Sequence, residues 1–127
     1  FHRSTIQEEE RKPFFIYLDE FHNFTTLSLV NMFSELRKFK VGFIVAHQYL
    51  NQLPVKIKEA VLGNIGTIIC FRISYMDAKY MAQEFYPIIT ANDFIQLENF
   101  HIYLKLLIDG KPSKPFSAKT ITKDWLK

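Results

Sequence analysis

The sequence predicts an α/β fold, with a parallel sheet flanked by helices and a β-hairpin at the C-terminus. Three apolar runs, at residues 14–18, 41–46 and 67–73, are separated by segments of helical periodicity. This alternation is typical of parallel strands joined by crossover helices. From His101 onward the apolar residues alternate with polar ones, which indicates a half-exposed strand. We expect one domain, because the 127 residues are 48% hydrophobic and can bury a single core.

The first strand is predicted at residues 14–18 and is followed directly by Asp19 and Glu20. Its uninterrupted apolar character suits a strand that is covered on both faces. A helix should then begin near Thr25 or Thr26, either of which can cap it, and end near Arg37 and Lys38. The expected buried stripe of this helix is Leu29, Met32, Phe33 and Leu36.

The second strand, at residues 41–46, places His47 and Gln48 at its carboxyl end. Pro54 suits the first turn of a short helix. That helix should carry Ile57, Ala60 and Val61 on one face.

The third strand is predicted at residues 67–73. Ser74 and Asp77 then form a Ser-x-x-Asp capping pattern for a helix, and residues 90–93 repeat the pattern before a shorter helix that ends near Asn99. The expected buried stripe of the longer helix is Ala78, Met81, Ala82 and Phe85.

The C-terminal part is predicted to be a hairpin. A strand at residues 101–108 leads into the turn Asp109-Gly110-Lys111, and residues 115–121 return as its partner. The domain therefore divides into a polar lead-in (1–12), an α/β core (13–98) and the hairpin (99–121).

Composition excludes several classes of protein. High aromatic content with few glycines excludes disorder and low-complexity sequence. No apolar run approaches the roughly 18 residues of a membrane helix, so we expect a cytoplasmic chain without a membrane segment. Cys70 is the only cysteine, which excludes a disulfide framework and favours a small core residue. The net charge of +3 permits contact with phosphate but does not by itself indicate nucleic acid.

The carboxyl ends of the predicted strands carry the candidate site, because ligands collect there in parallel sheets. An apolar strand followed by Asp19-Glu20 has the form of a Walker B element. In such an element the Asp holds the Mg²⁺ of a bound nucleotide, usually through water, and the Glu orients and deprotonates the attacking water. The alternative is a strand that runs into a solvated acidic turn.

Three further residues stand at the ends of the second and third strands. The Gln48 amide can reach a γ-phosphate or the attacking water, although it can equally be a polar loop residue. His47 has no second His or Cys at ligand spacing, so packing is favoured over metal binding. Arg72 interrupts a buried strand, so its guanidinium must pair with an internal carboxylate, the favoured option, or with a phosphate across a subunit boundary.

Two residue classes are open to a nucleic-acid interpretation. For the basic residues a solvated face is the favoured interpretation, and a path for DNA is the alternative. These residues are Arg37, Lys38, Lys40, Lys56 and Lys58. The phenylalanines at buried-face positions favour core over base stacking; they are Phe33, Phe43, Phe71 and Phe85.

The order of these motifs resembles the HerA/FtsK superfamily of DNA-pumping ATPases, and most closely the coupling-protein and conjugative-transfer ATPases of type IV secretion. The resemblance rests on FFIYLDEF (14–21), KVGFIVAHQ (40–48), GNIGTIICFRIS with Asp77-Ala78 (63–78), and the closing segment at 99–117. It covers residues 12–120.

The resemblance implies a RecA-like core that assembles as a ring, usually a hexamer, with ATP at the subunit boundaries and DNA through the centre. Asp19 would be the Mg²⁺ site, Glu20 the general base and Gln48 the sensor of the γ-phosphate. Arg72 would be the candidate for the arginine supplied in trans. Other secretion components are possible partners.

One element of the family pattern is missing, because the phosphate-binding loop G-x-x-x-x-G-K-[ST] occurs nowhere in the sequence. The chain also begins without Met, so we expect the C-terminal half of an ATPase core, inactive alone, whose membrane anchor, if any, lies upstream. The alternatives are a protein-secretion ATPase fragment and a non-catalytic α/β interaction module. A half-core should expose sheet faces and self-associate.

Overall fold

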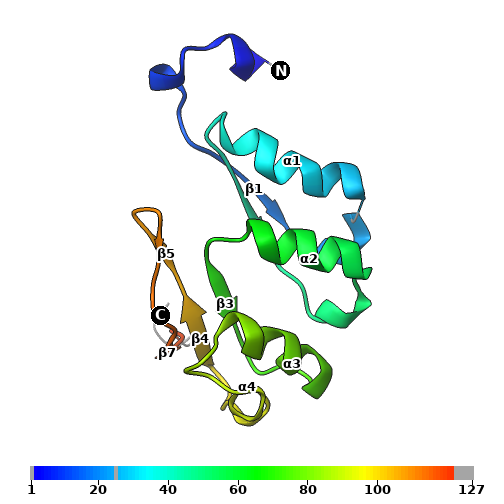
Figure 1. Ribbon diagram of the computed structural model, residues 1–127. Coiled ribbons are helices and arrows are strands. Elements are labelled where there is room, and N and C mark those ends of the chain that lie inside the picture. Colours follow the sequence, from blue (N-terminus) through cyan, green and yellow to red (C-terminus); the bar gives the residue numbers. More distant parts are fainter. Residues whose placement is uncertain (1, 25, 122–127) are drawn as a thin grey trace. The chain divides into compact units, whose positions relative to one another are not determined.

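The computed structural model describes residues 2–24 and 26–121 (Figure 1). The chain forms two compact units, Phe1–Asn64 (unit 1) and Ile65–Lys127 (unit 2), which are described in turn. The fold is mixed α/β, as predicted, but its sheets are small: a parallel pair, an antiparallel sheet of three strands and a two-stranded hairpin. No helix in the described ranges is long and apolar enough to cross a membrane. The expectation of a single domain stays a prediction.

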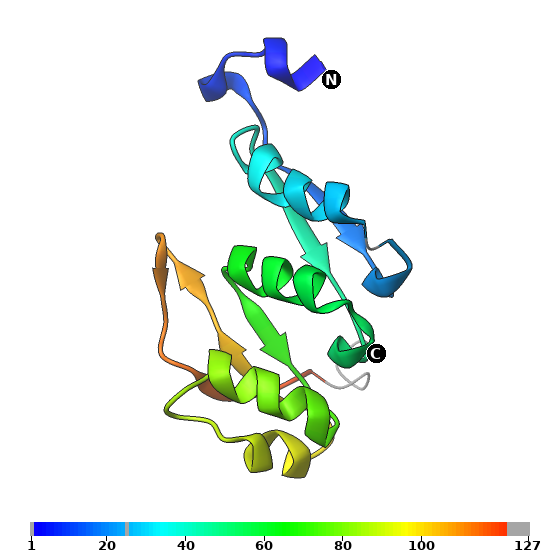
Figure 2. The same ribbon diagram turned by 45° about the vertical axis from the view of Figure 1, so that its right-hand side comes forward.

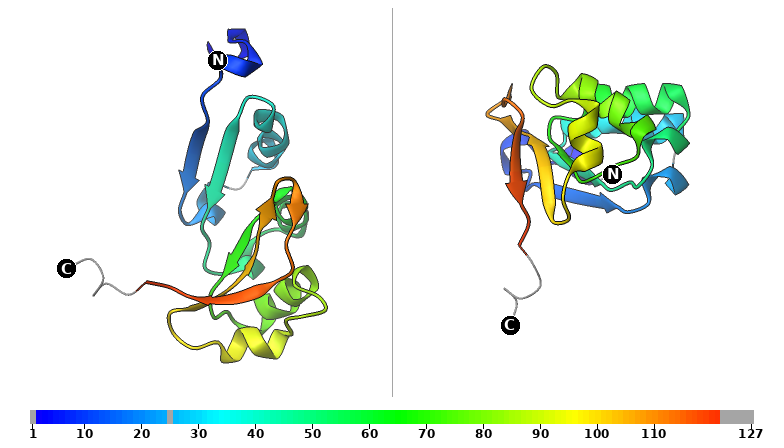
Figure 3. Two further views of the ribbon diagram at one scale, coloured as in Figure 1. Left: turned by 90° about the vertical axis from the view of Figure 1, so that its left-hand side faces the viewer. Right: turned by 90° about the horizontal axis from the view of Figure 1, so that it is seen from below.

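The described residues of unit 1 form two parallel strands and two α-helices. The elements are η1 His2–Thr5, η2 Glu8–Glu10, β1 Phe14–Leu18, η3 Phe21–Phe24, α1 Leu27–Arg37, β2 Val41–Val45, η4 Leu50–Gln52 and α2 Val55–Asn64, where η marks a 3₁₀ turn. Strands β1 and β2 run side by side in the same direction (Figure 3), with Phe14 beside Val41 and Leu18 beside Val45. The predicted parallel pairing of these two runs is confirmed.

Helix α1 covers one face of the parallel pair. The ring of Phe33 on α1 lies 4.5 Å, centroid to centroid, from the ring of Phe43 on β2. On the opposite face Phe15 and Tyr17 are 54% and 71% exposed. The expectation that both faces of β1 are covered is therefore wrong. A short apolar run is compatible with one covered face or with two, and periodicity cannot distinguish them.

The two helices of unit 1 follow the predicted pattern in part, because Phe33, Leu36 and Ala60 of the expected stripes are only half-buried. Helix α1 begins at Leu27; Thr25 and the side chain of Leu29 lie outside what the structure describes. Met32 of the expected stripe is 41% exposed. Pro54 directly precedes α2, where its carbonyl accepts hydrogen bonds from the amides of Ile57 and Lys58. On α2, Ile57 and Val61 are buried, and so is Lys58, which cannot belong to an exposed basic face.

Unit 2 contains an antiparallel sheet with two short helices (Figure 2). Its elements are β3 Ile68–Cys70, α3 Tyr75–Glu84, α4 Ala91–Gln96, β4 His101–Lys105, β5 Leu107–Ile108, β6 Lys111–Pro112 and β7 Phe116–Lys119. The sheet has the order β3-β4-β7, and β3 is antiparallel to β4. The recorded partner of β3 is therefore antiparallel, and a parallel pairing of β3 with a strand of unit 1 stays a prediction. Strand β3 also ends at Cys70, so Phe71, expected in the core, is 53% exposed.

The caps, the core and the hairpin of unit 2 confirm the corresponding predictions. Ser74 accepts a hydrogen bond from the amide of Asp77 at the start of α3, and Thr90 with Asp93 forms a complete capping box on α4. Ala78, Met81 and Phe85 of the expected stripe are buried, and Ala82 is half-buried. At the β5–β6 turn Asp109 and Gly110 both have positive φ, at 49° and 76°, as two-residue hairpin loops require.

Candidate functional site

The carboxyl ends of β1 and β2 are joined by backbone hydrogen bonds that continue past the strands. The amide of Ala46 donates to the carbonyl of Leu18 at 2.8 Å, and the amide of Phe21 donates to the carbonyl of Ala46 at 3.0 Å. Phe21 is 1% exposed and anchors the turn that follows β1. Asp19 and Glu20 are thereby held at the same end of unit 1 as His47 and Gln48.

Glu20 adopts an unusual backbone conformation. Its φ is +48°, in the left-handed region that few residues other than glycine occupy and that often marks functional sites. The conformation is supported locally, because the Glu20 amide donates to Oδ1 of Asp19 at 2.9 Å. The chain therefore turns sharply between the two carboxylates.

Both carboxylate oxygens of Glu20 contact neighbouring side chains. Nε2 of Gln48 donates a hydrogen bond to Oε1 of Glu20 at 2.5 Å. Nδ1 of His22 lies 3.5 Å from Oε2 of Glu20. The ring of His22 in turn lies against the ring of His47, with their centroids 5.4 Å apart. The structure therefore brings Glu20 and Gln48 together, as their positions after neighbouring strands led us to expect; their catalytic roles stay predictions.

The site is open to solvent on its carboxylate side. Asp19 and Gln48 are exposed, and the side chains of Glu20 and His22 are 38% and 34% exposed. Within the described residues, no cluster of three or more His, Cys, Asp or Glu could hold a metal ion by itself. Mg²⁺ is usually bound by one or two carboxylates together with water and substrate phosphates. An exposed Asp19 fits that kind of site, and it does not fit an all-protein cage.

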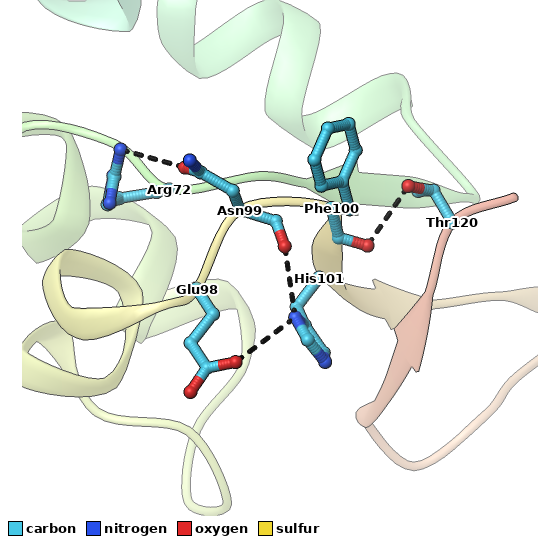
Figure 4. Close-up of polar contacts among 6 residues, drawn as sticks. All are labelled: Arg72, Glu98, Asn99, Phe100, His101 and Thr120. Atoms are coloured by element: carbon cyan, nitrogen blue, oxygen red, sulfur yellow. Dashed lines mark hydrogen bonds and ion pairs between the residues drawn. The ribbon is translucent and has the colours of Figure 1, made fainter. Parts of the chain in front are cut away.

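Arg72 lies in unit 2, after the end of β3, and is exposed. Its Nη2 donates to Oδ1 of Asn99 at 3.0 Å (Figure 4). The same figure shows the backbone carbonyl of Asn99 near Nδ1 of His101, at 3.2 Å. The premise that Arg72 interrupts a buried strand is wrong, and the partner the structure records is an amide, where a carboxylate was expected. Its role as an arginine acting in trans stays a prediction.

Sequence reasoning assigned no definite role to His22, which the structure places against Glu20. The signal that could have identified it is its position two residues after Glu20, inside the turn that must follow an exposed strand end. Unit 2 also has an open hollow of about 500 Å³ that contains none of the candidate residues. The hollow is lined by Glu84, Tyr86, Pro87, Ile88, Lys105, Pro112, Ser113, Lys114 and Pro115.

Comparison of the chain with protein-family models and with curated proteins found no match in either.

Proposed function

We propose that this chain supplies the acid and sensor side of an ATP-hydrolysing site in a motor that moves DNA, of the conjugative-transfer or type IV secretion type. The observation that carries the proposal is the contact between Gln48 and Glu20 at the carboxyl end of a parallel strand pair, with Asp19 beside it. Parallel strand ends are the usual place for nucleotide chemistry in α/β proteins. The motif resemblance supports a RecA-like core as the parent fold.

In the proposed reaction each residue has a distinct task. Glu20 accepts a proton from the attacking water, since its carboxylate is half exposed and aimed by its neighbours. Gln48 orients that water or the γ-phosphate through its amide, without a change of charge. Asp19 would hold Mg²⁺ through water, and the ion would neutralise charge on the phosphates when bound. Arg72 remains the candidate for the arginine supplied by a neighbouring subunit.

The phosphate side of the site is not assigned to this chain. Its sequence contains no G-x-x-x-x-G-K-[ST] loop, so the proposal requires the phosphates to be cradled by residues outside these 127. We therefore propose nucleotide turnover for the natural protein that contains the chain, assembled as a ring. Glu20 is the proposed general base of that reaction.

The test is Mg-ATP hydrolysis by that natural protein, with and without double-stranded DNA. We expect Glu20→Gln to lower kcat by about 10²- to 10⁴-fold, the usual contribution of a general base, while nucleotide still binds. Glu59→Gln is the matched control, because Glu59 is an exposed carboxylate on α2 of the same unit. It should hydrolyse ATP at the wild-type rate.

Three other outcomes would change the proposal. Turnover that needs Glu20 but ignores DNA would favour a protein-secretion ATPase. Wild-type turnover in Glu20→Gln would remove the general-base assignment. No turnover under any condition, in a folded protein, would favour a non-catalytic interaction module in which Asp19 and Glu20 only form an acidic turn.

A further inference from the structure

The Glu20 carboxylate is held from two sides by residues of different segments. Gln48, after β2, donates a hydrogen bond to Oε1, and Nδ1 of His22, in η3, lies at ion-pair distance, 3.5 Å, from Oε2. A glutamate side chain has three rotatable bonds, so an exposed carboxylate that is contacted on one oxygen only can still swing about that contact. A second contact on the other oxygen removes this freedom.

The turn that carries His22 is itself fixed. The amide of Asn23 donates to the carbonyl of Glu20 at 3.0 Å, which closes η3 directly behind Glu20. Phe21, between Glu20 and His22, is buried, with its ring 5.7 Å from that of Phe33 on α1. The His22 ring also packs beside that of His47. His22 therefore approaches the carboxylate from a turn that is closed by a backbone hydrogen bond and anchored by a buried ring.

We propose that His22 is a positioning residue, which holds Oε2 of Glu20 through Nδ1 and so fixes the direction in which the carboxylate faces. The inference rests on the proposed function and adds a residue to it. The inference requires a proton on Nδ1 of His22, because a carboxylate oxygen only accepts hydrogen bonds. Because His22 contacts Glu20 and not the nucleotide, its loss should lower kcat and leave KM unchanged.

The contact itself can be measured without any activity, on the chain alone. Nitrogen NMR of the histidine rings reports whether Nδ1 of His22 is protonated and hydrogen-bonded. We expect Glu20→Ala to shift Nδ1 of His22 and to leave Nδ1 of His101 unchanged, because His101 lies in unit 2 near Glu98 and Asn99. An unchanged His22 signal in Glu20→Ala would overturn the inference.

The catalytic consequence is measured in the natural protein with Mg-ATP. We expect His22→Ala to lower kcat about ten- to a hundredfold, the typical cost of losing a supporting contact to a reacting group, with KM unchanged. His22→Asn should recover part of the loss, because the Asn amide can donate from nearly the same place as Nδ1. Asn23→Ala, an exposed change in the same turn, controls for disturbance of the turn and should keep the wild-type kcat.

The outcomes separate this inference from the proposed function. If Glu20→Gln abolishes turnover but His22→Ala matches the wild type, the inference is overturned and the proposed function stands. Equal losses of kcat in His22→Ala and His22→Asn would also overturn it, because a merely structural ring would then explain the effect. If the wild type shows no Glu20-dependent turnover, the proposed function fails, and the catalytic part of the inference fails with it.

Discussion

The carboxyl end of the parallel strands in unit 1 and the helix-packed core of unit 2 are built in opposite ways. At the strand ends Asp19, Glu20 and Gln48 are polar and exposed or half exposed, and Glu20 holds a left-handed backbone. In unit 2 Phe85 and Phe94 are fully buried, with their rings edge to face 5.2 Å apart. In the first region the placement of polar groups lowers the stability of the fold. In the second region apolar burial raises it.

The difference teaches where function and stability can be separated in this chain. Carboxylates that remain partly in water lose little hydration when the chain folds, and they stay accessible to a ligand. Aromatic side chains sealed from water contribute stability and are closed to chemistry. Mutations in the two regions should therefore have distinct signatures: loss of turnover at the strand ends and loss of folding free energy in unit 2.

The largest expected effect on stability is that of Phe94→Ala. Phe94 is 0% exposed and packs edge to face against both Phe85 and Tyr103, so its loss should cost about 3–5 kcal/mol in the free energy of unfolding. Phe15→Ala is the matched control in unit 1, because Phe15 is 54% exposed on β1, and it should cost less than about 1 kcal/mol. Urea unfolding measures both. Equal losses would break the contrast between the two regions.

The thiol of Cys70 provides a second probe of the closed core. Burial, with a smaller contribution from the Asp77 carboxylate, raises the pKa of Cys70 from 9.0 to about 12. Below pH 9 the thiolate fraction should be about a thousandfold lower than in the unfolded chain, and thiol-labelling rates in buffer and in denaturant test this. Because the folded pKa is the higher one, this contribution to stability is complete below pH 9 and should be lost as pH rises toward 12. Equal labelling rates in buffer and in denaturant would show that the thiol of Cys70 on β3 is accessible to solvent in the folded chain.

The sequence predicted local features better than pairing. The Ser74 and Thr90 caps, the Asp109-Gly110 turn and the meeting of Glu20 with Gln48 were all predictable, because each depends on residue types a few positions apart or at the ends of adjacent parallel strands. The partner of β3 was not predictable, because its antiparallel pairing with β4 is set by tertiary packing that a short apolar run does not encode.

The exposure of β1 and the position of His22 were missed for related reasons. Phe15 and Tyr17 resemble core residues by type, and only the placement of α1 on the other face reveals that they are exposed. His22 lies near Glu20 because η3 turns the chain directly after Glu20. A 3₁₀ turn of four residues leaves too little periodicity in the sequence to be recognised.

Loss of the amide at the strand ends should affect turnover more than folding. Gln48→Ala removes the contact to Oε1 of Glu20, and in the natural protein we expect kcat for Mg-ATP to fall about tenfold or more. The free energy of unfolding should change by less than about 0.5 kcal/mol, because Gln48 is exposed. Gln52→Ala, an exposed amide on η4, is the control and should leave both quantities unchanged. A stability loss in Gln48→Ala larger than its loss of turnover would assign Gln48 to the fold.

The smallest effect should come from the capping box of α4, and it carries a pH signature. Thr90 donates to Oδ2 of Asp93 from both its hydroxyl and its amide, at 2.7 Å each, and these hydrogen bonds lower the pKa of Asp93 below 3.8. Thr90→Ala removes the hydroxyl and should lower the free energy of unfolding by about 1 kcal/mol at neutral pH. The control is Ser117→Ala, which removes an exposed hydroxyl on β7 and should leave that free energy unchanged.

Because the folded pKa of Asp93 is the lower one, the benefit of the box is complete above pH 3.8 and is lost as pH falls through the folded value. Urea midpoints of the wild type and of Thr90→Ala should therefore move closer together in acid, where the hydrogen bond from the Asp93 amide to Oγ1 of Thr90 remains. A gap that stayed constant with pH would mean that Thr90 stabilises α4 through its bond from the Asp93 amide alone, and that the ionised Asp93 contributes nothing to unit 2.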